Sequence, residues 1–139
     1  MNHDKLHKYL DDGAVFTINA VGVTFKSSSY PQINRQTNII EMKEGVEAED
    51  REIELRADTN NKFDDYALEI MYEGYDTGFI PKNNDIHIKT AEGKGRRAYV
   101  KGVNKMLLEY PNKLEVEVEG IYGGYKGRHL GFSVSVSKA

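Results

Sequence analysis

Apolar and polar side chains alternate with a period of two through much of the chain, which is the pattern of half-buried β-strands. The clearest case is LEVEVEG at 114–120, where Val116 and Val118 are expected to face a core and the glutamates solvent. Runs rich in β-branched and aromatic residues predict further strands at 15–25, 53–55, 67–72, 77–80, 97–103 and 130–137, and a strand end with a turn at 106–113. Gly22, inside the first run, is expected to mark a bulge or bend.

Residues 3–12 predict a short amphipathic helix, with Asp4 as the candidate N-cap and Gly13 just beyond its end. The helix is expected to pack over the domain, and the alternative is an arm that faces a partner. One or two helical turns are expected at 38–43, ended by Gly45. At 81–95, the alternation of 85–89 favours a strand, whereas the Asn84 cap and the later glycines favour a helix.

Seven or so short strands with small helical insertions predict a single, mainly β domain over residues 1–139. We expect a closed or nearly closed antiparallel β-barrel of the OB type at 15–137, preceded by the helical arm at 3–12. The hydrophobic content of 39% is typical of a globular chain. No apolar run is long enough to span a membrane and no export signal opens the chain, so a cytoplasmic monomer is expected.

The charges are unevenly distributed around a net charge of −3. Residues 41–58 contain eight acidic and three basic side chains, whereas residues 89–105 contain six basic side chains and one acidic side chain. A charge run is usually a solvated face. This asymmetry nevertheless permits one basic edge for phosphate groups on an otherwise acidic molecule, which suits a short nucleic-acid footprint.

The sequence contains no motif of a serine hydrolase, a zinc protease or a P-loop NTPase, so we expect no enzyme activity. The absence of cysteine excludes disulfides, thiolate nucleophiles and zinc fingers. His3 and His7 are four residues apart, a spacing that can chelate a metal, but they lie on a terminal segment that is expected to fray. We therefore expect neither a metal nor a cofactor.

The segment 58–65, between two predicted strands, is the strongest candidate site. Asp58, Asn60 and Asn61 predict a tight turn held by their own side chains. Phe63 and Asp64 place an aromatic ring beside a carboxylate at a loop tip, where burial alone would not place it. Aromatic rings at turns and a basic groove are what single-stranded nucleic acids require. The aromatic residues predicted at turns or strand ends are Phe25, Phe63, Tyr66, Tyr75, Tyr122 and Tyr125.

These residues also resemble the HIRAN domain, a module found on helicase-like remodelling enzymes and as a stand-alone bacterial or phage protein. The resemblance rests on the central pattern from Leu55 to Pro81, which includes Asp58, Asn61, Phe63, Asp64, Ala67, Leu68, Ile70 and the Gly78-Phe79-Ile80-Pro81 segment. It extends to residues 20–25 and to the Arg35-Gln36 pair. The resemblance also favours the helix at 81–95, which we therefore predict.

The resemblance implies capture of the free 3′ end of single-stranded DNA. By matched position, Phe63 and Phe25 are the stacking aromatics, Asp64 accepts the 3′-hydroxyl and Lys82 binds a phosphate. Asn61 belongs to the same motif, and Tyr122, Tyr125 and Phe132 compete for the position of a last aromatic.

Two positions depart from the family pattern. Thr24 stands where the pocket can have an arginine, and Lys26 where it can have a tyrosine, so Lys26 is expected to supply charge in place of stacking area. The alternative is a protein-interaction or accessory module that keeps the barrel without the DNA pocket. In either case, a DNA-processing protein is the expected protein partner.

Overall fold

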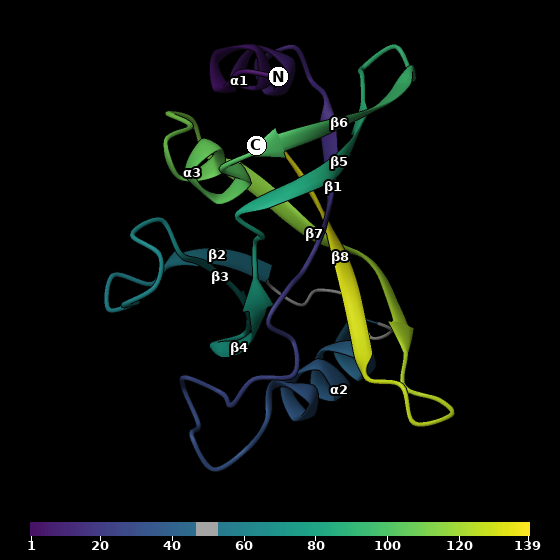
Figure 1. The fold of residues 1–139 in the computed structure, drawn as a ribbon. Helices are drawn as coiled ribbons and strands as arrows, with labels where there is room; N and C mark the ends of the chain where they lie inside the picture. Colours follow the sequence, from purple (N-terminus) through teal and green to yellow (C-terminus); the bar gives the residue numbers. More distant parts are fainter. Residues whose placement is uncertain (47–52) are drawn as a thin grey trace.

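The computed structural model describes residues 1–46 and 53–139, so that part of the acidic segment 41–58 lies outside the described residues. The described chain forms two antiparallel sheets and three helices (Figure 1). The larger sheet has the order β6-β5-β1-β8-β7 and the smaller sheet the order β2-β3-β4. The strands are β1 (Val15–Asn19), β2 (Ile53–Ala57), β3 (Leu68–Tyr72), β4 (Tyr75–Phe79), β5 (Asn83–Lys89), β6 (Gly95–Lys101), β7 (Leu114–Gly123) and β8 (Leu130–Lys138).

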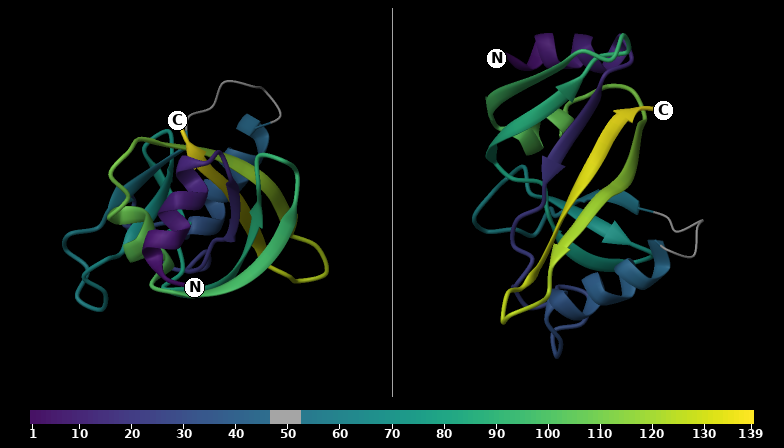
Figure 2. Two further views of the ribbon diagram at one scale, coloured as in Figure 1. Left: turned by 90° about the horizontal axis from the view of Figure 1, so that it is seen from above. Right: turned by 90° about the vertical axis from the view of Figure 1, so that its right-hand side faces the viewer.

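Helix α1 (His3–Asp11) lies across one end of the larger sheet, and both chain termini lie at that end (Figure 2). Leu6 and Leu10 of α1 are fully buried, so the helix packs over the domain as predicted. Its N-cap is Asn2 and not Asp4, because the Asn2 side chain accepts the Lys5 N–H at 2.8 Å. None of the helices that the structure describes is long and apolar enough to cross a membrane.

The other two helices differ from the expected ones. Helix α2 (Arg35–Val46) begins earlier than the predicted turns at 38–43 and includes Gly45. Helix α3 (Val103–Leu108) occupies part of the segment that was predicted to be a strand end and turn, and this prediction was wrong. Val103, Met106 and Leu107 of α3 are buried at helical spacing, so packing of this short apolar face determines the structure.

The predicted helix at 81–95 is also wrong, because this segment contains β5 and the turn into β6. Strand β5 pairs with β1 on one side and with β6 on the other. Ile86 and Ile88 are fully buried on its inner face. Pairing on both sides and the burial of two isoleucines therefore override the helix signals of Asn84 and the later glycines.

The first strand is shorter than the predicted run 15–25. It ends at Asn19, after which Val21 forms an isolated pair with Phe79 at the end of β4. Gly22 is not a bulge but lies in a turn, with φ of +69° and its carbonyl accepting the Phe25 N–H. The positive φ favours glycine at this position, and a Cβ here would also lie 3.2 Å from the Phe79 ring, a tight contact.

The mainly β fold with an N-terminal helix is confirmed, whereas a closed barrel is not. The Val21–Phe79 pair joins the two sheets on one side. On the other side β2 and β7 approach each other, but no described pairing joins them. The core between the sheets contains Phe16 and Ile18 of β1 and Phe132, Val134 and Val136 of β8, all fully buried. Val116 and Val118 of β7 pack against it, as the alternation of 114–120 predicts.

Candidate nucleic-acid interface

The loop between β2 and β3, residues 58–67, is held by its own polar side chains, as predicted. The Asp58 carboxylate accepts hydrogen bonds from the Asn60 N–H at 3.3 Å and from the Asn61 amide at 3.4 Å. The Asn61 side-chain oxygen accepts the N–H groups of Phe63 at 2.9 Å and Asp64 at 3.1 Å. Asn61 is therefore a positioning residue, since its oxygen is used to shape the tip of the loop.

Phe63 and Asp64 point into different environments. The Phe63 ring is 95% exposed, which is the largest exposure recorded for an apolar side chain of the described residues. Asp64 is half-buried, and its carboxylate accepts the Asn104 side-chain amide at 2.6 Å and the Tyr66 N–H at 2.9 Å. A carboxylate offers about four acceptor positions, so these two bonds fix Asp64 while leaving it acceptor capacity.

Helix α3 brings Lys105 to this loop and holds the backbone of Lys82. The Val103 N–H donates to the Lys82 carbonyl at 2.8 Å. The next residue, Asn104, donates its side-chain amide to the Asp64 carboxylate. The Lys105 ammonium lies 5.0 Å from the centre of the Tyr66 ring, a cation–π distance. We call Phe63, Asp64, Tyr66, Lys82 and Lys105 the loop cluster. Three segments of the chain build it, and Lys82, which is exposed, joins it through its backbone carbonyl.

Sequence reasoning missed Asn104, and it counted Lys105 in the basic segment 89–105 without placing it beside this loop. Their contribution depends on α3, which was predicted as a different element. The signal that identifies α3 is the helical spacing of Val103, Met106 and Leu107, which are all buried. Asn104 itself is 1% exposed, so its amide is part of the fold and not only of the surface.

Phe25 and Lys26 lie in a different loop, between β1 and α2. Phe25 is 63% exposed. Its ring lies near the Phe79 ring at the end of β4, since a Cβ built at Gly22 would contact both rings. Lys26 is exposed and pairs through its backbone with Asn34. No described contact joins Phe25 to Phe63. Phe79 nevertheless precedes Lys82 by only three residues, so β4 links this loop to the loop cluster.

Tyr122 and Tyr125 lie at the hairpin between β7 and β8, on the other side of the molecule from the 58–67 loop (Figures 1 and 2). Both rings are more than half exposed. The predicted single rim of aromatic loops is therefore not assembled. The hairpin carries its own basic residues, Lys126 and Arg128, and forms a separate exposed surface.

The basic segment 89–105 forms most of an exposed edge of the larger sheet. On the outer face of β6, Tyr99 is 55% exposed between Arg97 and Lys101, which are also exposed. The register pairs Arg97 with His87 of β5. Arg96 points to the other face and donates to the Tyr9 hydroxyl at 3.1 Å. The basic edge predicted from the sequence is thus solvent-accessible.

His3 and His7 fasten α1 to the rest of the chain. The His3 Nε2 lies 2.8 Å from the Lys101 carbonyl and the His7 Nε2 lies 2.7 Å from the Met106 carbonyl. A carbonyl oxygen only accepts, so each Nε2 carries the donated proton. Their four-residue spacing therefore serves packing. Within residues 1–46 and 53–139, no group of three or more metal-ligating side chains is found.

A buried ionic network lies beneath the loop that carries Phe25. The Arg35 Nε donates to the Asp76 carboxylate at 2.7 Å, and a second guanidinium nitrogen lies 3.8 Å from Glu69. All three side chains are at most 3% exposed. Asp76 also accepts the Ser27 hydroxyl at 2.5 Å and the Ser28 N–H at 2.8 Å. The serine-rich loop between β1 and α2 is therefore anchored.

The pKa values of the two carboxyl groups in this network are shifted in opposite directions. Burial alone would raise the pKa of Asp76, but hydrogen bonds from Ser27, Arg35 and the backbone outweigh it and hold that pKa far below its usual range. Burial raises the pKa of Glu69, against the Ser28 hydroxyl bond and the charge of Arg35. Asp76 is thus the firmly ionised partner of Arg35, and the network has a structural role.

Comparison of the chain with protein-family models, with curated proteins and with solved structures finds no match. The observed fold and site define a mainly β protein with a loop, held by its own side chains, that presents an exposed aromatic ring and a hydrogen-bonded carboxylate.

Proposed function

We propose that the protein is a non-catalytic module that binds the free end of a single nucleic-acid strand at the loop cluster. The observation that supports this proposal most strongly is the Phe63 ring, 95% exposed on a loop whose backbone is fixed by Asn61. An aromatic ring left in water contributes none of the free energy that its burial would add to folding. A loop that is rigid and still presents such a ring is suited to stacking against a flat partner.

The neighbouring groups suit a strand end with a hydroxyl. Asp64 is held by Asn104, so its free acceptor capacity is oriented before any ligand arrives. A carboxylate accepts an O–H hydrogen bond and repels a phosphate at the same position, and it would therefore distinguish a terminal hydroxyl from an internal nucleotide. We assign the phosphates that precede this end to Lys105, whose ammonium lies by the Tyr66 ring, and to the exposed Lys82, whose backbone is held by α3.

The proposal includes the finer expectations of the HIRAN resemblance. The ligand is single-stranded DNA ending in a 3′-hydroxyl, the body is an OB-like barrel that is nearly closed, and the module works as a cytoplasmic monomer beside a DNA-processing protein. The departures at Thr24 and Lys26 and the distant hairpin tyrosines reduce the stacking area. We therefore expect modest affinity that depends mainly on Phe63, with Phe25 and Tyr66 in support.

A 3′-hydroxyl oligothymidylate is expected to bind about tenfold more tightly than its 3′-phosphate, the magnitude of a hydrogen bond to a charged group. Fluorescence anisotropy at low salt, with the dye on the 5′ end, measures both affinities. Asp64→Ala should remove the preference, whereas Asp65→Ala, which changes an exposed neighbour, should keep it. Phe63→Ala should weaken both ligands alike, because a base loses its stacking partner.

The same titrations can also contradict the proposal. Equal affinities of the hydroxyl and phosphate ends for the unchanged protein would contradict end recognition. Asp64→Ala also frees the Asn104 amide, at a cost of about 1–2 kcal/mol in unfolding free energy, so each variant is first checked by thermal melting. An oligouridylate measured alongside decides between DNA and RNA.

A further inference from the structure

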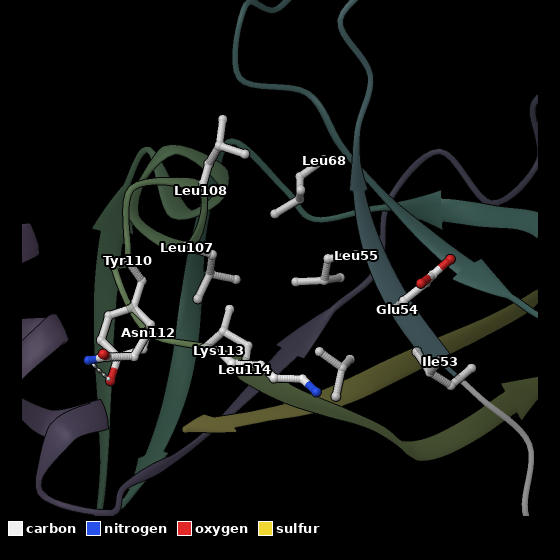
Figure 3. Close-up of a pocket in the computed structure, with 11 residues that line it drawn as sticks. Ile53, Glu54, Leu55, Leu68, Leu107, Leu108, Tyr110, Asn112, Lys113 and Leu114 are labelled. Carbon is white, nitrogen blue, oxygen red and sulfur yellow. Dashed lines mark hydrogen bonds between the residues drawn. The ribbon is translucent and has the colours of Figure 1, made fainter. Parts of the chain in front are cut away.

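The two edges of the larger sheet differ in what covers them. At one edge β2 approaches β7 closely, and Leu55, Leu107 and Leu114 converge in the space between them (Figure 3). At the other edge, among the described elements, β6 packs extensively against β5 alone. These two strands lie at the periphery of the molecule, with α1 on their inner side (Figure 2). The outer face of β5 and β6 is therefore open to a partner.

Charge is segregated by sign across the outer face of this sheet. One row of register partners runs from β6 to β7, and it consists of Arg97, His87, Thr17, Ser135 and Glu117. The row begins with a cation, passes through three residues without a permanent charge and ends with an anion. A surface that serves solubility alone usually intersperses the two signs. This segregation would steer an anionic partner to β5 and β6 and away from β7.

We call the exposed side chains of Lys89, Arg97, Tyr99 and Lys101 the basic strip. None of its three cations forms an ion pair with a residue of 1–46 or 53–139. Asp85, opposite Tyr99 in the register, is the acidic residue on the outer face of these two strands. The three cations outnumber it, so the strip attracts anions.

The spacing of the cations suits a polymer. Arg97 and Lys101 are four residues apart on one strand, a separation of roughly 13 Å. A single phosphate ion cannot bridge that distance, whereas successive phosphates of an extended strand can reach both cations. Tyr99 lies between them, 55% exposed, and offers its ring to a base. An acidic peptide or an anionic membrane would use the cations without using this ring.

One end of the basic strip adjoins the loop cluster. Lys101 pairs in the register with Asn83, the residue that follows Lys82. The Asn83 side chain also accepts the Gly102 N–H at 3.1 Å, directly after Lys101.

We propose that the basic strip binds the phosphodiester backbone of a single nucleic-acid strand, which passes from Lys101 to Arg97 as it leaves the loop cluster. The direction of the strand, with its 3′ end at the loop cluster, rests on the proposed function. The contact between the strip and the backbone does not, because it needs no strand end.

The test uses a circular oligothymidylate, which has no end, beside a linear one of equal length that ends in a 3′-hydroxyl. Anisotropy of an internal dye at several salt concentrations gives both affinities. Arg97→Gln with Lys101→Gln should weaken both ligands about tenfold at low salt. It should also reduce the slope of log affinity against log salt by about 1.4, the contribution of two phosphate contacts to a single strand.

Matched variants make the test specific, and thermal melting first shows that each is folded. Lys43→Gln with Arg128→Gln removes the same two charges at exposed positions on α2 and the β7–β8 hairpin, and should change neither affinity by more than about twofold. Tyr99→Ala should weaken the circle about tenfold without changing the salt slope, because a base loses its stacking partner. Asp85→Asn should tighten the circle about threefold, because it removes a repelling charge.

Several results would overturn the proposal. Equal losses in the strip variant and its matched control would do so, as would an unchanged salt slope. Polyglutamate that bound as tightly as the circle, with neither sensitive to Tyr99→Ala, would assign the strip to an acidic protein segment. Binding to phosphatidylserine vesicles but not to the circle would assign it to a membrane. Failure of end recognition is distinguishable, because the hydroxyl and phosphate ends would then bind equally while the circle still depended on Arg97 and Lys101.

Discussion

Replacing Asp76 by alanine is expected to lower the free energy of unfolding by about 3–5 kcal/mol, the usual cost of breaking a buried ion pair from one side. Asp76 is fully buried, 2.7 Å from the Arg35 guanidinium, so its removal leaves that cation with Glu69 at 3.8 Å as its remaining anion. Most domains are stable by only about 5–15 kcal/mol. Urea unfolding followed by circular dichroism measures the loss.

An exposed ion pair provides the control for this measurement. Lys8 and Asp12 are 3.1 Å apart on α1, with side chains 76% and 63% exposed. Because water and ions screen such a pair, Lys8→Ala should change stability by no more than about 0.5 kcal/mol. If Asp76→Ala and Lys8→Ala had similar effects, the network around Arg35 would not be the anchor that its geometry indicates.

The effect of Asp76 is expected to depend on pH. Its folded-state pKa lies below the ordinary value of 3.8, so at acidic pH the unfolded chain binds the proton more readily than the folded chain. The stabilisation is therefore complete above that ordinary value and is lost as the pH falls through the folded-state pKa. The difference in unfolding free energy between the unchanged protein and Asp76→Ala should shrink in urea titrations below about pH 4.

Glu69 contributes to the pH dependence of the free energy of unfolding with the opposite sign. Burial raises its folded-state pKa, so the folded chain binds this proton more readily than the unfolded chain and stability from this group increases as the pH falls. Because Glu69 and Asp76 share Arg35, Glu69→Gln is introduced into both proteins so that the comparison reports Asp76 alone. A difference that grew on acidification would contradict the assignment of Asp76 as the ionised partner of Arg35.

The sequence was sufficient where local chemistry decides the structure. The alternation of 114–120 predicted the two faces of β7, and the Asp58–Asn61 side chains predicted the self-bonded turn, because both signals lie within a few residues. The exposed position of Phe63 followed from the same turn. These parts of the fold and of the candidate site need no information from distant segments.

The remaining parts depend on contacts between segments that are far apart in the chain. Ser27 reaches Asp76 over 49 residues, and Asn104 reaches Asp64 over 40 residues. The first contact anchors the loop between β1 and α2, and the second depends on α3. The β5 strand was predicted as a helix because local cap signals and the family resemblance were weighted above the alternation of Ile86 and Ile88. Pairing with two neighbouring strands favours that alternation.

Replacing Gly123 by alanine is expected to cost about 2–5 kcal/mol, the sum of a left-handed backbone and an overpacked contact. Gly123 ends β7 with φ of +83°, and a Cβ there would overlap the carbonyl oxygen of His129 on the facing strand end. A backbone oxygen in a hairpin cannot rotate away as a side chain can. The hairpin would have to open, and it is this hairpin that carries Tyr122 and Tyr125.

A variant at Gly127, in the same hairpin, separates the cost of the left-handed backbone from the cost of the overpacked contact. Its φ is +75°, but a Cβ there would meet nothing within 4 Å, so Gly127→Ala should cost only the backbone strain of about 1–2 kcal/mol. Gly124→Ala should lie between them, because its Cβ would meet the movable end of the Leu130 side chain. Urea unfolding of the three variants should rank them in this order. Equal losses for Gly123→Ala and Gly127→Ala would mean that the hairpin relaxes without cost, and then the contact with His129 would not determine its shape.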